Sequence, residues 1–108
     1  MLERDRGRLI HVSSGMGVEG RPGRSAYSAS KHGLEGFSEA LAAELSDTGV
    51  SSIVIEPGGG VNTERFTIGM GPEEMADRLD PAVIVEPLLD LAAGHGTNGS
   101  RYIADEFD

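Results

Sequence analysis

RLIHVSS at residues 8–14 and VSSIVIE at residues 50–56 are two short apolar runs, and SAYSASKHGLEGFSEALAAELS at residues 25–46 lies between them. Both short runs are rich in β-branched side chains, which is typical of buried strands. The stretch between them is long enough to cross back over a sheet as a helix. These segments therefore predict a strand–helix–strand unit with parallel strands.

The central stretch has the periodicity of an amphipathic helix. Its large apolar residues recur every three or four positions, as Leu34, Phe37, Leu41 and Leu45, while Glu35 falls on another side. Gly49 follows the stretch, where a left-handed C-terminal cap is expected. The pattern predicts a helix over residues 25–46 that packs through its leucine side.

Three further segments follow residue 56. A glycine-rich loop is expected over residues 57–72, then a short helix over residues 72–79 and a helix opened by Pro81. Because Pro87 falls after the first turn, that helix is expected to begin late or to kink. SRYIA at residues 100–104 reads as a third strand. The order predicts an α/β fold with a three-stranded parallel sheet and crossover helices.

Length and charge limit the function classes. The 108 residues favour one domain. Residues 1–34 hold six basic and three acidic side chains, and residues 35–108 hold three basic and fifteen acidic ones, which gives the net charge of −9. Such an acidic chain is a poor partner for nucleic acid or an anionic membrane, so neither is expected.

Other sequence signals are few. There are no cysteines, which excludes disulfides and thiolate chemistry. No apolar stretch approaches the ~20 residues that span a bilayer, and the first residues lack the apolar core of a secretion signal. A cytoplasmic location is therefore expected. His11, His32 and His95 have no metal-like spacing, so no metal site is expected.

Tyr27 and Lys31 are four residues apart near the start of the predicted helix and therefore share one face. A free tyrosine has a pKa near ~10, too high for ready proton exchange at neutral pH. A nearby ammonium favours the phenolate, which suits a general acid or base. Lys31 is the only lysine of the chain, so its place beside a tyrosine is informative.

Ser14 and residues 57–63 follow the first and second predicted strands. Ligand crevices of open α/β sheets lie beyond the carboxyl ends of the strands, so these segments are expected at one crevice. A serine hydroxyl there can bind a substrate oxygen. Each signal alone is weak, since most Tyr-x-x-x-Lys pairs lie on protein surfaces.

Together the motifs are specific. The chain combines four motifs: a predicted strand that ends in Ser13-Ser14, the YSASKHGL run at residues 27–34, LAAEL at residues 41–45 and VIEPG at residues 54–58. In this combination it strongly resembles the short-chain dehydrogenase/reductase family. The family's catalytic serine precedes its tyrosine by thirteen residues, which selects Ser14. The resemblance covers essentially the whole chain and implies a partial Rossmann-type sheet.

The resemblance implies an NAD(P)-dependent oxidoreductase acting on a small carbonyl or alcohol substrate, with NAD or NADP as the cofactor. Tyr27 would exchange a proton with the substrate oxygen, which Ser14 would hold. Lys31 would assist Tyr27 and bind the nicotinamide ribose, so the resemblance places both Tyr27 and Lys31 among the cofactor-binding residues. The nicotinamide would be lined by Pro57, Gly58, Val61 and Thr63, although this loop is one residue longer than the family's Pro-Gly-x-Val-x-Thr.

The family's phosphate-binding glycine motif, Asn-Ala-Gly strand and active-site asparagine all precede the strand that here begins near Arg8. Residues 1–108 therefore resemble the C-terminal portion of one domain. The resemblance implies a homo-oligomer for the full-length protein, formed partly through residues 25–46. The alternative is a non-catalytic remnant or binding module of the same fold, and the 108 residues alone are expected to be inactive.

A G-x-G-x-x-G pattern at residues 15–20 follows the first strand. A pyrophosphate site requires a helix to open at these glycines, but Arg21-Pro22-Gly23 intervene. The acid at the end of the next strand, Glu56, also lies 36 residues past Gly20 rather than about 20. These residues are therefore expected to form a loop beside the substrate.

Overall fold

The computed structural model of the chain describes residues 1–58 and 80–106. Within these residues the sheet has three parallel strands in the order β1 (Gly7–Val12), β2 (Val50–Glu56) and β3 (Arg101–Ile103). Gly7 pairs with Val50, and Val54 with Arg101. The predicted α/β fold with parallel strands is confirmed. The predicted helix over residues 72–79 lies outside the described residues.

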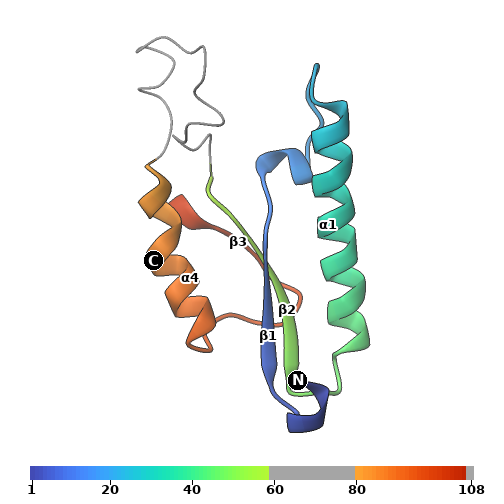
Figure 1. The fold of residues 1–108 in the computed structure, drawn as a ribbon, viewed down its shortest axis with the longest axis vertical. Coiled ribbons are helices and arrows are strands. Elements are labelled where there is room, and N and C mark those ends of the chain that lie inside the picture. The colour runs from blue at the N-terminus through green and yellow to red at the C-terminus, as the bar shows by residue number, and fades with distance from the viewer. Residues whose placement is uncertain (59–79, 107–108) are drawn as a thin grey trace.

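Two helices lie on opposite sides of the strands (Figure 1). α1 (Ser25–Glu44) connects β1 to β2, and α4 (Val85–Ala92) precedes β3. Short 3-10 turns complete the described chain: η1 (Leu2–Arg4), η2 (Gly15–Gly17), η3 (Pro81–Ile84) and η4 (Ala104–Glu106). None of the helices in this part of the chain has the length and apolarity needed to cross a bilayer.

The apolar core lies on the α4 side of the sheet. Ile53 and Ile55 of β2 are fully buried with Leu91 of α4, and Ala104 completes the cluster. Ile53 and Ile55 are two residues apart in a strand, so both side chains point to the same face. This alternation turns Ser52 and Glu56 of β2 toward α1 on the other face.

The α1 side of the sheet is polar where it is buried. Ser38 of α1 hydrogen-bonds Ser52 (Oγ to Oγ, 2.8 Å), and His11 Nε2 lies 3.0 Å from the same Ser52 oxygen. Ser38 and Ser52 are buried, and hydrogen bonding makes their burial tolerable. The expected packing of α1 through its leucine side is only partly right, because Phe37 is 57% exposed.

The end of α1 also differs from expectation. Leu45 is the C-terminal cap with φ −93°, and Gly49 does not have the expected left-handed conformation. The Thr48 hydroxyl instead donates to the Leu45 carbonyl (2.8 Å). Gly49 is required for another reason, because a β-carbon there would collide with the Asp5 carbonyl oxygen.

The second helix begins late, as predicted from its prolines. Residues 81–84 form the 3-10 turn η3, with the Asp80 side chain accepting from the Ala82 amide (2.9 Å). Pro87 then lies in the first turn of α4, where a missing amide hydrogen costs no helix hydrogen bond. α4 is thereby placed with Leu91 against the core.

Candidate active site

The carboxyl end of β1 carries Ser13 and Ser14 into η2. The Ser13 amide donates to the Ile55 carbonyl (2.8 Å), so the pairing with β2 continues past the last strand residue. Ser14 is extended and caps η2, where its Oγ accepts a hydrogen bond from the Met16 amide (3.0 Å). This bond uses an acceptor site of the hydroxyl and leaves its proton available for donation.

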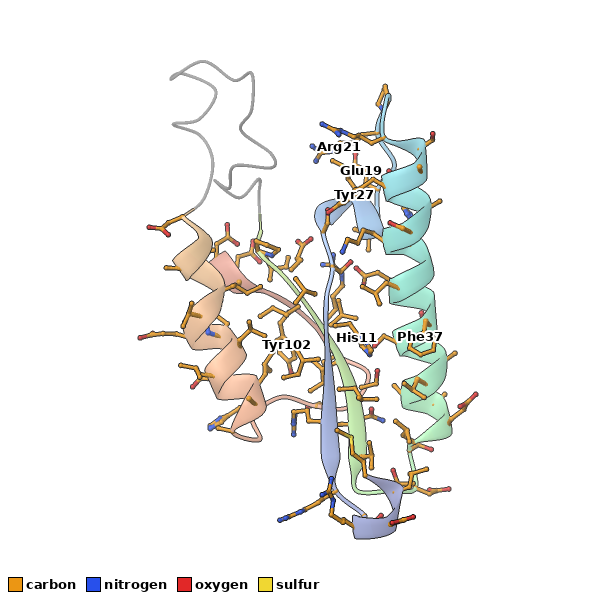
Figure 2. All side chains as sticks on the ribbon, in the orientation of Figure 1. His11, Glu19, Arg21, Tyr27, Phe37 and Tyr102 are labelled. Carbon is orange, nitrogen blue, oxygen red and sulfur yellow. The ribbon has the colours of Figure 1, made fainter. Side chains whose placement is uncertain are left out.

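Tyr27 and Lys31 lie in the first two turns of α1. The Lys31 ammonium is 5.7 Å from the centroid of the Tyr27 ring. It also donates to the Val12 carbonyl (3.1 Å), two residues before Ser14. Figure 2 shows Tyr27 at the beginning of α1, beside η2. The structure thus joins Lys31 both to Tyr27 and to the strand end that carries Ser14.

Pro57 and Gly58 leave the carboxyl end of β2. The Pro57 carbonyl accepts from the Asp105 amide (3.2 Å). Gly58 has φ 102°, and a β-carbon there would collide with the Asp105 carboxylate, so this position requires glycine. Val61 and Thr63, the other two residues expected at the nicotinamide, lie outside the described residues.

An ion-pair network lies beside these strand ends. The Arg101 Nε, from β3, donates to both carboxylate oxygens of Glu35 (3.1 and 2.9 Å), and Nη2 donates to Glu56 Oε2 (3.0 Å). Nη2 also donates to the Ser14 carbonyl (3.2 Å). The expectation that Glu35 falls away from the packed side of α1 is therefore wrong, and the network was not foreseen from the sequence.

The environment of Arg101 keeps its guanidinium charged. Burial lowers the pKa of Arg101, but hydrogen bonds from the guanidinium to Glu56 and Glu35, with the charges of both carboxylates, raise this pKa by more. The net result is an Arg101 pKa above its ordinary value. A permanently charged guanidinium therefore offsets part of the repulsion between the two largely buried carboxylates.

The G-x-G-x-x-G stretch does not open a helix, as expected. Its first three residues form η2, and α1 begins only at Ser25. Gly17 is buried against α1, where a β-carbon would lie 2.6 Å from Ser13 Oγ and 2.7 Å from Glu35 Oε2. This glycine permits close packing of η2.

No cluster of three or more His, Asp or Glu side chains suited to a metal ion occurs in residues 1–58 and 80–106.

Gly17→Ala is expected to destabilise the chain by about 1–3 kcal/mol, because the added methyl must displace a hydrogen-bonded serine and glutamate. The measurement is the free energy of unfolding in urea. Gly20→Ala is the matched control in the same loop, since nothing lies within 4 Å of its β-carbon position. Equal effects of the two substitutions would contradict the packing role of Gly17.

Comparison with curated proteins shows relatives among oxidoreductases. The chain is 38% identical over 106 residues to the uncharacterized oxidoreductase YbbO of Escherichia coli K12, an alignment covering 80% of this chain and 39% of YbbO. It is 45% identical over 58 residues to the 3-oxoacyl-[acyl-carrier-protein] reductase of Bos taurus, covering 54% of this chain and 24% of that protein.

Solved structures show the same similarity. A putative NAD(P)-dependent gluconate 5-dehydrogenase from Beutenbergia cavernae with bound NADP has a TM-score of 0.85 and 28% identity. The match covers 97% of this chain and 47% of that one. A short chain dehydrogenase from Salmonella enterica serovar Typhi has a TM-score of 0.80 and 30% identity, over 95% of this chain and 43% of its own.

In all four proteins the chain therefore spans less than half of the relative's length. The sequence profile of one family, described as short chain dehydrogenase, matches residues 1–67. This match takes in β1, α1 and β2, with Ser14, Tyr27, Lys31 and the start of the loop after β2. Since it covers more than half of the 108 residues, the chain belongs to the short-chain dehydrogenase family.

Proposed function

We propose that Ser14, Tyr27 and Lys31 form the proton-transfer site of an NAD(P)-dependent oxidoreductase that interconverts a small carbonyl compound and the corresponding alcohol. The observation that carries the proposal is the position of Lys31. Its ammonium lies against Tyr27 and is hydrogen-bonded at the strand end that bears Ser14. Residues 1–108 would contribute this site as part of a single Rossmann-type domain.

Each side chain has a role that follows from its contacts. Tyr27 would give a proton to a carbonyl oxygen during reduction, or accept one from a hydroxyl during oxidation. The positive charge of Lys31 favours the phenolate form that remains after donation. Ser14 accepts from the Met16 amide, so its own proton can be donated to the substrate oxygen.

The described residues fit the nicotinamide end of a dinucleotide. An ammonium has three N–H groups, and among the described partners of Lys31 only the Val12 carbonyl accepts one. The remaining donors suit the two hydroxyls of a ribose. Pro57 and Gly58, with Val61 and Thr63 beyond them, would line the nicotinamide. When bound, the nicotinamide supplies or accepts the hydride.

Two relatives support the cofactor and the substrate class. The Beutenbergia cavernae structure contains bound NADP and matches nearly the whole of this chain. The bovine relative is a reductase of a 3-oxoacyl group, which is a ketone. We extend both features to this chain as a nicotinamide cofactor, NAD or NADP, and a carbonyl or alcohol substrate.

The test is a titration of the ¹⁵N-labelled chain with NADPH or NADH, followed by NMR. We expect the largest shift changes at Ser14, Tyr27 and Lys31. ADP is the control, because it carries the adenosine and the pyrophosphate but neither the nicotinamide nor its ribose, and it should leave these three signals unchanged. Identical changes with ADP, or changes confined to other residues at millimolar NADPH and NADH, would contradict the proposed site.

A further inference from the structure

We infer that Arg101 is a positioning residue for the Ser14 hydroxyl, acting through a clamp formed by Glu35, Arg101, Glu56 and the Ser14 carbonyl. The inference rests on the proposed function, because it assigns a residue of β3 to the same site. It starts from the Arg101 guanidinium, which contacts three other elements at once: α1, the end of β1 and the end of β2.

The clamp holds the backbone of Ser14 in a defined orientation. Arg101 Nη2 donates to the Ser14 carbonyl (3.2 Å), which also accepts from the Gly17 amide of η2 (2.9 Å), and the two bonds together hold the plane of the Ser14–Gly15 peptide. That peptide leads directly into η2, whose Met16 amide donates to Ser14 Oγ. A rotation of the peptide would move the Met16 amide and release the hydroxyl. Of the two donors to this carbonyl, the Gly17 amide belongs to η2 itself, so we infer that Arg101 supplies the external contact that sets the orientation of η2 and of the Ser14 side chain.

The residue before Ser14 is tied into the same clamp. The Ser13 hydroxyl donates to Glu35 Oε2 (2.8 Å), the oxygen that also accepts from Arg101 Nε (2.9 Å). Glu35 therefore contacts the strand end directly, at Ser13. It also orients the Arg101 guanidinium, which contacts the next residue, Ser14. Ser13 is buried, and the side chain of Glu35 is 14% exposed, which restricts alternative arrangements.

The planar shape of the guanidinium is essential to this geometry. Nε donates to Glu35, whereas Nη2 donates to Glu56 and to the Ser14 carbonyl, so the donors point in fixed, different directions. A lysine ammonium keeps the positive charge but offers its three donors from a single atom. Arg101→Lys should therefore preserve charge compensation between the carboxylates and lose the contact with Ser14.

The chain offers a matched control in Arg8. Its guanidinium is also held by several acceptors, donating through Nη1 to the His95 carbonyl (2.8 Å) and through Nη2 to the Gly94 carbonyl (3.0 Å). These acceptors follow α4, and Arg8 lies near the start of β1, away from the end that carries Ser14. Arg8→Lys removes comparable hydrogen bonds without touching the clamp.

The experiment measures the amide of Met16 by NMR in the 108-residue chain. Arg101→Lys should change its chemical shift and speed its exchange with water roughly tenfold or more, after correction for any change in global stability. Glu35→Gln should act in the same direction. Arg8→Lys should leave both readouts at wild-type values. An unchanged Met16 amide in Arg101→Lys, or an equal change in Arg8→Lys, would overturn the inference.

A double-mutant cycle on turnover separates this role from general stabilisation. In a form of the protein that reduces carbonyl substrates, Arg101→Lys should lower kcat about tenfold or more and leave the cofactor Kd unchanged. In the Ser14→Ala background, the same substitution should have almost no further effect, because Arg101 acts through Ser14. Additive losses would refute positioning through Ser14. If no turnover exists, the proposed function fails, whereas the Met16 amide still decides whether Arg101 orients Ser14.

Discussion

Tyr27→Phe is expected to lower the rate of NAD(P)H-dependent carbonyl reduction by at least ~10²-fold and up to ~10⁴-fold, the range of general acid–base catalysis. The substitution removes the hydroxyl that would donate the proton and leaves the ring beside Lys31 in place. Cofactor binding should change little, since the donors proposed for the ribose belong to Lys31. The readout is kcat and the cofactor Kd, measured separately.

The assay requires a protein in which residues 1–108 follow a dinucleotide-binding half, for example a chimaera with the corresponding half of one of the relatives. Tyr102→Phe is the control, because it removes the only other tyrosine hydroxyl of the chain, which accepts from the Thr97 amide (3.0 Å). Turnover of this control should remain within a few-fold of the unmodified chimaera. Near-normal turnover of Tyr27→Phe would refute the assignment of Tyr27 as the proton donor.

The strands were predicted well from the sequence because short runs of apolar, β-branched residues indicate a buried strand without reference to the rest of the chain. The run of β-branched residues in β2 has the predicted bounds, Val50–Glu56, and the late start of α4 follows from its prolines. These features depend on neighbours a few positions away. Such signals are available without any knowledge of the rest of the fold.

The packed face of α1 was harder to predict. Apolar periodicity pointed to Phe37, yet buried Ser28 and Ser38 face inward and Phe37 is mostly exposed. Phe37 instead packs edge-on against the His11 ring, with centroids 5.9 Å apart. Burial of the Ser38 hydroxyl is tolerated because it meets a hydrogen-bond partner, and that partner, Ser52, lies on another element. No local pattern carries that information.

The same reasoning explains which part of the site was missed. Tyr27 and Lys31 are one helical turn apart, so their proximity follows from spacing alone. Arg101 is 45 residues from Glu56 and 66 from Glu35, and their contact depends on the parallel register that sets Arg101 against Val54. An arginine at the start of a short strand and a glutamate ending another were visible signals, but only the register joins them.

The isolated 108 residues are expected to bind NADPH about a thousandfold more weakly than the same residues in a chimaera that turns over. The contacts proposed here, from Lys31 and the loop beginning at Pro57, reach only the nicotinamide end of the cofactor. The chain has two G-x-G-x-x-G stretches, and neither opens an α-helix: residues 15–20 form η2 and a loop, and residues 94–99 lie between α4 and β3. Neither stretch therefore presents helix amides to a pyrophosphate. A deficit of ~4 kcal/mol in binding corresponds to that thousandfold difference.

Isothermal titration calorimetry with two ligands tests this expectation. Reduced nicotinamide mononucleotide lacks the adenosine half of NADPH, so the isolated chain should bind the two with similar, weak affinity. The chimaera should strongly prefer NADPH, because its other half supplies the contacts to the pyrophosphate and adenosine. Micromolar binding of NADPH by the 108 residues, with a marked preference over the mononucleotide, would contradict the expectation. It would mean that these residues hold the adenosine half of the cofactor themselves.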